Sequence, residues 1–389
     1  MLLTRRFIAI TVVNFFAACN VGVFYLFPLF LADRGGTSAD IGYIMGVFPL
    51  ASVLSRPMMS ELIDRLGRKR SYALASLIMI TASLAYLAFT GGLGDFYLPL
   101  LLVRAIHGVS AGLTFTAGFT YAADIIPENR MNEGMGLFGT SGLLGFAIGP
   151  VMAEIIIRHL GFPAYFLFAA ILPAIGVLLL FPLPETYVHD RSQKGGAFLA
   201  VLRQSKITIV SVLVLIMGIG VASTSGFVSL LAQSRGILLV SPYFLAYSGA
   251  AVAMRLLGGR LADIVGESRV VPPALVVCGI GLILLVFANA VQYLVLAGLI
   301  SGAAHGLLFP CLNTIAIRRE TAGQRAKILA IVTGSFDAGV FGGSIGLGQV
   351  GKYLGFPAIF LIAGLTFFLG VGIFLVRPRG RSTQYDIKT

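Results

Sequence analysis

Residues Arg56–Arg70 read RPMMSELIDRLGRKR and join two long apolar runs of the chain. The stretch places an acid and a cluster of bases at one mouth of a helical hairpin. A second version, RLLGGRLADIVG, follows about 200 residues later at Arg255–Gly266. In both, an Asp lies eight positions after the first Arg, and a Gly lies three positions after that Asp. The repeat indicates a chain built from two related halves.

The composition contains too few charges for a soluble surface. Of 389 residues, 57% are hydrophobic, 11% are charged and 48 are glycine. A soluble domain carries roughly 25% charged residues. Apolar runs of about 20 residues, the length that crosses a bilayer as a helix, recur throughout. We therefore predict an all-α polytopic membrane protein, in which glycine lets helices approach closely.

Other classes of protein fit the sequence poorly. The net charge is +12, but the bases gather in short junctions, so membrane topology explains them better than nucleic-acid binding does. Cys19, Cys278 and Cys311 lie in different apolar runs without metal spacing, so we expect buried small side chains. No phosphate loop, metal cluster or nucleophile–base–acid spacing is present in the sequence, so neither an enzyme nor a cofactor is expected.

Hydropathy predicts twelve membrane-spanning helices. Their expected ranges are 7–31, 41–62, 72–91, 97–122, 133–157, 163–183, 207–231, 242–262, 271–289, 293–317, 328–350 and 355–376. A polar central loop, 184–206, divides them into two pseudo-symmetric six-helix bundles. The bundles cover 1–183 and 207–376, and a polar tail covers 377–389.

Lysine and arginine are distributed unequally between the two sets of junctions. One set contains only Arg34, Arg158, Arg235 and Lys352, whereas the other holds the Arg65–Arg70 cluster, the central loop and the bases near both termini. Basic loops stay on the cytoplasmic side of a membrane. We therefore predict a multi-pass protein of the cytoplasmic (inner) membrane with both termini cytoplasmic.

The two halves repeat at further places. The pentapeptide LGFPA occurs at Leu160–Ala164 and at Leu354–Ala358, each time between the fifth and sixth helix of its half. His107-Gly108 in the fourth helix corresponds to His305-Gly306 in the tenth. Parallel six-helix repeats are a known plan of secondary transporters, with the substrate site between the halves.

The loop between the second and third helices carries a family resemblance. In the major facilitator superfamily this loop reads G-x-L-x-D-R-x-G-R-K-x. Only the first position departs here, where Ser replaces Gly. The matching residues are Ser60, Leu62, Asp64, Arg65, Gly67, Arg68, Lys69 and Arg70.

Two further helices strengthen this resemblance, which covers the whole chain. The fourth helix is similar to the family's second motif through Arg104, Gly108 and Gly112. The fifth resembles the motif G-x8-G-x3-G-P, typical of the antiporter branches, through Gly136, Gly145, Gly149 and Pro150. The chain looks like the bacterial drug and sugar-efflux permeases, a resemblance that implies export by proton antiport.

The charges at the hairpin mouths are gate candidates by this resemblance, although topology alone also explains the bases. Asp64 would meet the positive N-terminus of the eleventh helix, near Ile328, and latch the cytoplasmic side. Arg56 and Arg255 lie inside helix ends, where they either snorkel to the interface or act in the gate. The full set of candidates is Arg56, Asp64, Arg65, Gly67, Arg68, Arg255 and Asp263.

Two acids within apolar helices are candidates for proton coupling. Asp337, near the middle of the eleventh helix, is expected to be the main carrier, because a carboxylate without a partner there would exchange protons with water on either side. A structural pair with an arginine is the alternative. Glu154 in the fifth helix is either a second protonation site or a partner of Arg158, four residues further on.

Three basic side chains complete the proton-coupling set. Arg104 and His107 share one face of the fourth helix, and His305 mirrors His107. Arg104 keeps its charge and must be paired, hydrated or bound to an anion; the matching arginine of the family is linked to proton transfer. Each histidine either titrates near neutral pH or is a hydrogen-bonded packing residue.

Polar residues of the first and seventh helices are candidates for the substrate cavity. They must point inward, where they either line the cavity or make hydrogen bonds between helices. The candidates are Asn14, Asn20, Tyr25, Ser223, Thr224 and Phe227.

The sequence as a whole predicts a secondary transporter that works by alternating access. Protons are expected to drive the export of a small amphipathic organic molecule. The alternatives are proton-coupled uptake of a small solute, for example an anion held by Arg104, and a non-transporting membrane sensor. The expected partners are the substrate, protons and membrane lipid. We expect a monomer without a cofactor.

Overall fold

Helices make up the regular structure of the described residues, which are 2–186, 205–318 and 322–376 of this computed structural model, and no strand occurs among them. The side chains of 60, 129, 132, 205, 258–263 and 322–327 are not described. The tail and most of the predicted central loop therefore lie outside the described residues.

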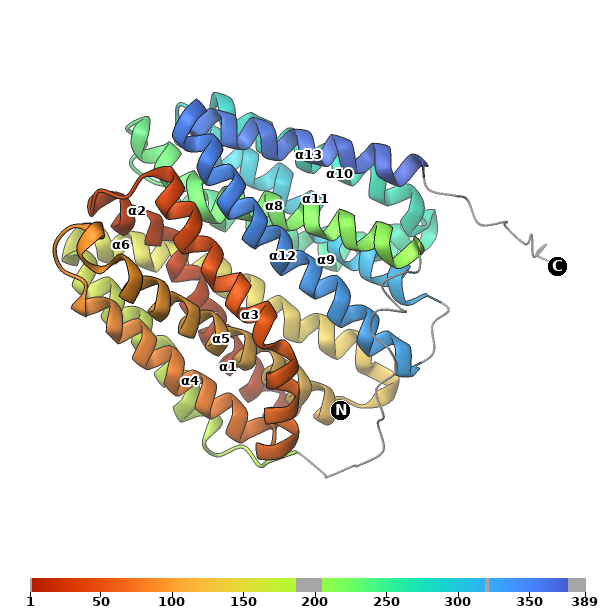
Figure 1. Ribbon diagram of the computed structural model, residues 1–389. Coiled ribbons are helices and arrows are strands. Elements are labelled where there is room, and N and C mark those ends of the chain that lie inside the picture. Colours follow the sequence, from red (N-terminus) through yellow and green to blue (C-terminus); the bar gives the residue numbers. More distant parts are fainter. Residues whose placement is uncertain (1, 187–204, 319–321, 377–389) are drawn as a thin grey trace.

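The helices form two groups along the chain (Figure 1). The N-terminal group consists of α1 (Arg5–Val23), α2 (Phe27–Asp33), α3 (Ser38–Leu66), α4 (Arg68–Ala85), α5 (Leu93–Ile125) and α6 (Met131–Leu180). The C-terminal group consists of α8 (Ser205–Ser234), α9 (Ser241–Val265), α10 (Glu267–Leu284), α11 (Val291–Ile317), α12 (Ala322–Leu354) and α13 (Phe356–Val376). Short 3₁₀ turns cover Phe24–Leu26, Tyr86–Ala88, Glu128–Arg130 and Leu285–Phe287.

Ten helical stretches of the described residues are long and apolar enough to cross a membrane. This confirms the predicted class of all-α polytopic membrane protein. One stretch, Glu133–Leu180, contains a break at Gly161, where φ is 76°. Gly355 has a φ of 80° between α12 and α13, at the second LGFPA. Because glycine adopts positive φ readily, the repeated pentapeptide is a repeated bend.

The start of α12 differs from the prediction. The helix begins at Ala322, whereas hydropathy placed its start at 328. Hydropathy registers only the apolar part of a helix. The preceding turn, AGQRAK, contains good helix formers and is polar.

Glycines in the repeated hairpin junctions set the turns between helices. Gly67, between α3 and α4, has a φ of 92°, and Gly266, between α9 and α10, has a φ of 90°. A Cβ on Gly67 would also lie 2.5 Å from the Glu185 carboxylate. The sequence repeat therefore corresponds to a repeated backbone geometry.

Small residues hold α6 close to α1. A Cβ on Gly145 would lie 2.6 Å from Ala18 Cβ, and one on Gly149 would lie 2.5 Å from the Cys19 carbonyl oxygen. By contrast, nothing lies within 4 Å of a Cβ on Gly136. Two of the three glycines of the antiporter-type motif thus enforce close packing.

The two His-Gly pairs also mark close helix contacts. A Cβ on Gly108 would lie 2.1 Å from the Phe48 carbonyl oxygen of α3. A Cβ on Gly306 would lie 2.5 Å from the Ala251 carbonyl oxygen of α9. The α5–α3 and α11–α9 contacts are therefore built in the same way.

We expect Gly108→Ala to destabilise the protein, because its added methyl group would force α5 away from the α3 backbone. Overpacking of this kind costs about 1–3 kcal/mol. The measurement is the apparent melting temperature of detergent-purified protein, followed by size-exclusion chromatography after heating. Gly136→Ala is the matched control, and an equal melting temperature for the two variants would contradict the packing argument.

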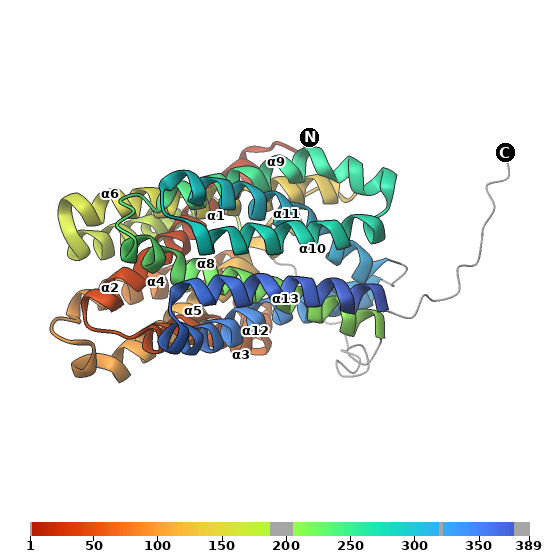
Figure 2. The ribbon, with the colours of Figure 1, turned by 90° about the horizontal axis from the view of Figure 1, so that it is seen from above.

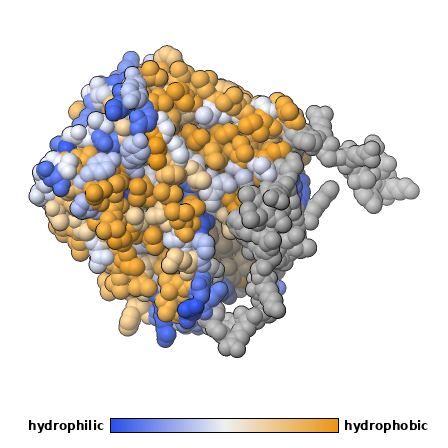
Figure 3. Space-filling view, in the orientation of Figure 1, coloured by the Kyte–Doolittle hydropathy of each residue, from blue (hydrophilic) through white to orange (hydrophobic). Residues whose placement is uncertain are grey.

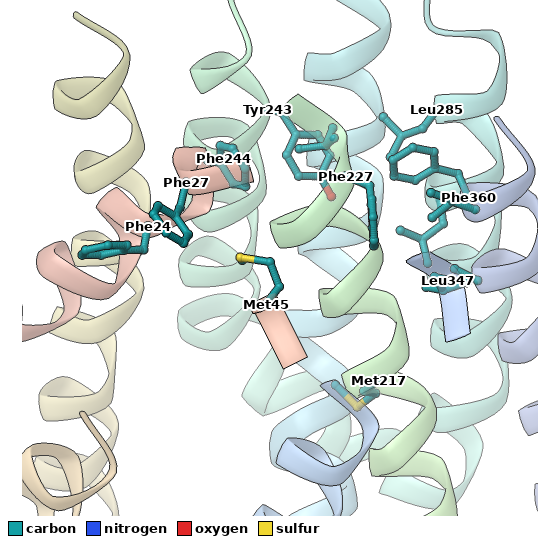
Figure 4. Close-up of a cluster of buried hydrophobic side chains, with 14 of the residues drawn as sticks. Phe24, Phe27, Met45, Met217, Phe227, Tyr243, Phe244, Leu285, Leu347 and Phe360 are labelled. Atoms are coloured by element: carbon teal, nitrogen blue, oxygen red, sulfur yellow. The ribbon is translucent and has the colours of Figure 1, made fainter. Parts of the chain in front are cut away.

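The hydrophobic side chains divide between a packed interior and an apolar surface. In the interior, Phe24 and Phe27 lie on one side, and Phe227, Tyr243 and Phe360 lie on the other (Figure 4). The surface in Figure 3 is largely hydrophobic, with hydrophilic residues gathered at its upper-left and lower edges. Such a surface fits a lipid environment.

Two helix pairs make the main contacts between the N-terminal group and the C-terminal group, and α2 also touches α8. Helix α3 packs against α12, and α6 packs against α9. In Figure 2, α3 and α12 lie along one edge of the molecule, and α6 and α9 lie along the other. We call the end of the helices with the Arg65–Arg70 cluster the basic end, and the end with Ser38 and Gly161 the opposite end.

Candidate functional site

An ion pair crosses the α3–α12 interface. Arg56 of α3 donates from Nη2 to Oδ2 of Asp337 on α12. The two side chains are 29% and 19% exposed. A gate candidate and the main proton-coupling candidate are therefore partners. The sequence left an arginine pair open for Asp337 but could not name the arginine, because 281 positions separate the two residues.

Backbone contacts close the same interface toward the opposite end. A Cβ on Gly42 would lie 2.4 Å from the Ser344 carbonyl oxygen, and one on Gly348 would lie 2.7 Å from the Ser38 carbonyl oxygen. Hence α3 and α12 touch almost backbone to backbone between the ion pair and the opposite end. Opening this end would require the two helices to separate.

Glu154 joins the two groups at the α6–α9 interface. Its carboxylate oxygens accept hydrogen bonds from the backbone N–H groups of Val240 (2.8 Å) and Ser241 (3.0 Å), at the N-terminus of α9. Arg158 Nη2 lies 3.5 Å from Oε1, so the expected i,i+4 pair is also present. Glu154 is 7% exposed. A carboxylate at a helix N-terminus is favoured by the unpaired N–H groups and the helix dipole.

The sequence missed this contact of Glu154 with α9. The only local signal is Ser241-Pro242, which is typical of a helix start. Nothing in that signal identifies an acid 86 positions earlier as the group that caps the helix.

The charges at the first hairpin mouth interact within the N-terminal group. Arg68 lies 3.4 Å from Asp64 and 3.2 Å from Asp124 of α5. The Asp64 side chain is 60% exposed. Its predicted contact with the start of the eleventh helix would involve the side chains of 322–327, which are not described. The side chain of Asp263 is also among those not described. The latch role of both acids stays a prediction.

Glu185 is a functional candidate that the sequence did not single out. Its carboxylate accepts hydrogen bonds from the backbone N–H groups of Arg68 (2.8 Å) and Lys69 (3.2 Å) at the start of α4. Glu185 therefore caps the N-terminus of α4, where the family's loop motif ends. Arg65 pairs with Glu61, four residues earlier, and is 73% exposed.

Arg104 lies in an aromatic cage, which we define as Phe24, Phe27 and Phe48. The guanidinium carbon is 5.3, 5.2 and 4.6 Å from the three ring centroids. Arg104 is 3% exposed, and its Nε and Nη1 have no hydrogen-bond partner. In this cage the negative faces of the rings attract the cation. The sequence predicted that Arg104 is paired, hydrated or bound to an anion, and this prediction did not include aromatic rings.

His107 belongs to a hydrogen-bond network between helices of the N-terminal group. Its Nε2 lies 3.0 Å from Asn20 Oδ1, and Asn20 Nδ2 donates to the Ala169 carbonyl oxygen at 2.7 Å. Asn14 Nδ2 similarly donates to Ser141 Oγ at 2.9 Å. For these three residues the structure supports the alternative of hydrogen bonding between helices.

The corresponding histidine of the C-terminal group has different surroundings. His305 packs near Tyr247, with ring centroids 5.6 Å apart, and beside Phe309. It borders a cavity of about 10 Å³ whose lining includes Thr224 and Ser301. This volume has room for about one water molecule.

The other cavity candidates lie in packed regions. Ser223 donates to the Gly220 carbonyl oxygen at 2.7 Å, and Phe227 is fully buried in the hydrophobic core. The ring of Tyr25 lies between Phe146 of α6 (5.9 Å) and Phe244 of α9 (5.3 Å). The ring of Tyr25 thus contacts the C-terminal group, through Phe244.

The geometry of the two interfaces defines a class of protein. Long apolar helices in two groups meet at these interfaces, and charged side chains cross both of them. No three His, Cys, Asp or Glu side chains within the described ranges could hold a metal ion together. These features are typical of a membrane transporter whose two parts move relative to each other.

The family model of the Major Facilitator Superfamily matches residues 8–247 and 210–388. The chain belongs to this superfamily. It is a multi-pass membrane transporter and not an enzyme, and the predicted resemblance to bacterial efflux permeases is confirmed by its relatives.

Two curated relatives are multidrug resistance proteins. The chain is 24% identical over 380 residues to multidrug resistance protein MdtG of Klebsiella pneumoniae (strain 342), which covers 92% of this chain and 90% of the relative. It is 25% identical over 356 residues to MdtG of Serratia proteamaculans (strain 568), with 87% and 85% covered.

Solved structures share the fold at low identity. The nucleoside transporter NupG matches with a TM-score of 0.72 and 17% identity, over 96% of this chain and 98% of that chain. The human organic anion transporter MFSD10 matches with a TM-score of 0.71 and 18% identity, over 95% of this chain and 99% of that chain. These structures support the transporter fold.

Proposed function

We propose that this protein is a proton-coupled efflux transporter with twelve membrane-spanning helices in two six-helix bundles. The two sides of the bend at Gly161 each count as one span, and α9, with 25 residues, is long enough for a further one. The excess of bases at the basic end supports a cytoplasmic location of that end and of both termini in the inner membrane.

The ion pair between Arg56 and Asp337 is the observation that carries this proposal. It joins the two groups, and each charge stabilises the other inside an apolar interface, where a lone charge is costly. Protonation of Asp337 would remove one charge of the pair and weaken the contact of α3 with α12. Proton uptake is thereby coupled to movement of one bundle against the other.

The arrangement corresponds to the inward-facing state in this proposal. The opposite end is closed by the backbone contacts of Gly42 and Gly348 and by Glu154 on α9. In this state Asp337 has released its proton toward the cytoplasm and pairs with Arg56. Substrate then enters from the basic end. Return to the outward-facing state follows the opening of both closed interfaces.

The alternative functions receive less support. Uptake of an anion held by Arg104 is disfavoured because the aromatic cage leaves this residue 3% exposed. A sensor without transport would not need an ion pair across the moving interface. Small-molecule substrate, protons and lipid are the proposed partners of a monomeric protein without a cofactor.

Proton movement in proteoliposomes tests this function. Purified protein is reconstituted with a pH-sensitive dye inside the vesicles, an inward-acidic or inward-alkaline gradient is imposed, and a panel of amphipathic compounds is added. We expect at least one compound to move protons in the direction opposite to its own flux. Empty vesicles and vesicles with a protonophore are the controls. If the flux of every transported compound is the same with and without the pH gradient, proton coupling is disproved.

A further inference from the structure

The two interfaces between the groups are structural counterparts that differ in their charges. Arg56 and Arg255 occupy the same place in the repeated hairpin motif. Gly145 and Gly149 pack against α1 as Gly339 and Gly343 pack against α8. This correspondence aligns α6 with α12.

The alignment identifies the counterpart of Asp337. Asp337 lies two positions before Gly339, and the residue two positions before Gly145 is Leu143. The α3–α12 interface therefore has an arginine opposite an aspartate, whereas the α6–α9 interface has an arginine opposite a leucine. At the aligned position, the second arginine has a leucine where the first has an acid.

The surroundings of Arg255 agree with this difference. Its Nη1 lies 3.7 Å from the Cβ position of Gly139, one helical turn before Leu143, so the side chain reaches toward α6. Its Nε is buried without a hydrogen-bond partner, as is that of Arg56, so the two arginines differ in the carboxylate and not at Nε. Among the described side chains no carboxylate forms an ion pair with Arg255, while Arg56 pairs with Asp337.

A row of aromatic rings begins on the same helix as this arginine. Tyr247 is two turns before it on α9, and the ring of Tyr247 lies 5.6 Å from that of His305 on α11. The His305 and Phe309 rings are stacked at 6.3 Å, and Phe336 of α12 lies 6.1 Å from Phe309. All four ring side chains are partly exposed. The helix that carries Arg255 thus also carries the first ring of a partly exposed aromatic wall.

We propose that Arg255 binds the substrate and that the substrate class is an amphipathic organic anion with a carboxylate or similar group on an aromatic body. The guanidinium would hold the anionic group through two parallel hydrogen bonds, and the aromatic wall would contact the rings. A bound anion would neutralise a cation for which the described side chains supply no carboxylate partner. This substrate class rests on the proposed transport function.

Neither Arg56 nor Arg104 offers the same site. Arg56 is already neutralised by Asp337, and Arg104 is enclosed by its aromatic cage. Of these three arginines, Arg255 is therefore the one that the described side chains leave available for an anion.

Equilibrium dialysis with the full chain in nanodiscs tests the proposal. The probes are radiolabelled 2-naphthoate and pyrene-1-carboxylate, each compared with its neutral amide. We expect the acids to bind about tenfold more tightly than the amides, as a charge-assisted hydrogen bond predicts. Equal binding of acid and amide, or binding of neither, for both ring sizes would overturn the proposal.

Four variants separate the role of Arg255 from a general effect on folding. Arg255→Gln is expected to abolish the preference for the acid, and Arg255→Lys to retain most of it. Leu143→Asp would supply the missing carboxylate and abolish the preference with Arg255 intact. Its matched control, Leu143→Asn, is expected to keep the preference. An acid preference that survives in Arg255→Gln, or an equal loss in Leu143→Asn and Leu143→Asp, would overturn the assignment.

The binding experiment uses no ion gradient, so its result is independent of proton coupling. If transport proves uncoupled from protons while the acid preference depends on Arg255, the coupling proposal fails and the substrate class stands. If coupling is observed without any acid preference, the substrate class fails and the coupling proposal stands.

Discussion

Asp337→Asn is expected to abolish proton-driven export while leaving substrate binding measurable. Asparagine has nearly the same shape as aspartate but cannot carry a proton or accept the full charge of Arg56. We expect the initial rate of export driven by a pH gradient to fall more than tenfold, because the step that couples proton release to closure of α3 on α12 is lost. The readout is export from proteoliposomes with and without the gradient.

Controls distinguish this result from a loss of folded protein. Asp33→Asn changes an acid whose side chain is 58% exposed at the opposite end, and it should transport normally. The double variant Arg56→Gln/Asp337→Asn removes both charges, and it should be more stable than Asp337→Asn alone, since no uncompensated arginine remains. Normal gradient-driven export by Asp337→Asn would eliminate this residue as the proton carrier.

Glu154→Gln is expected to shift the protein toward a state that is open at the opposite end. The change removes the negative charge that holds the N-terminus of α9 against α6. A helix-terminal charge in a partly buried setting contributes up to about 2 kcal/mol, which corresponds to about a thirtyfold change in the ratio of the two states. The closing contact of the α6–α9 interface would then be weak, whereas the α3–α12 contacts would be unchanged.

Distances between spin labels at the opposite end measure this shift. Leu160, just before the bend of α6 at Gly161, and Leu238, before α9, are 68% and 77% exposed, so both accept labels after replacement by cysteine. The native residues Cys19, Cys278 and Cys311 are buried and would be replaced by alanine. We expect a longer-distance population to grow in Glu154→Gln.

Arg158→Gln is the matched control for Glu154. This variant removes the ion pair between Arg158 and Glu154, whose atoms lie 3.5 Å apart, but leaves the two hydrogen bonds that Glu154 accepts from the backbone of α9. A small shift in this control and a large one in Glu154→Gln would separate the helix cap from the ion pair. Identical distance distributions for wild type and Glu154→Gln would show that the contact does not hold this end closed.

Most of the fold was predictable because its determinants are local. An apolar run of bilayer length predicts a helix, and a glycine with positive φ ends it, as at Gly67, Gly161 and Gly355. The start of α12 was misplaced because its first turn is polar, and hydropathy reports membrane depth and not helix formation. The His-Gly repeats indicated related halves, and the structure adds that Gly108 and Gly306 are places of close helix contact.

The candidate site was predictable only as a set of residues. Asp337, Glu154 and Arg104 stood out because charge is rare in an apolar span, but their partners were not evident. Arg104 is surrounded by phenylalanines, a residue type that occurs 29 times in the chain and therefore gives no local signal. Asn20 and His107 looked like cavity and proton residues, yet they hydrogen-bond to each other between helices.

Local sequence was enough to specify the helices, their repeat in two halves and the glycines that bend or pack them, because these features depend on residues within one or two turns. The packing of the whole chain was needed to show that Asp337 meets Arg56, that Glu154 caps α9 and that Arg255 reaches Gly139 of α6. These contacts depend on which faces of distant helices pack together. That choice is made by side-chain volume and backbone approach across whole interfaces, which no single stretch of sequence contains.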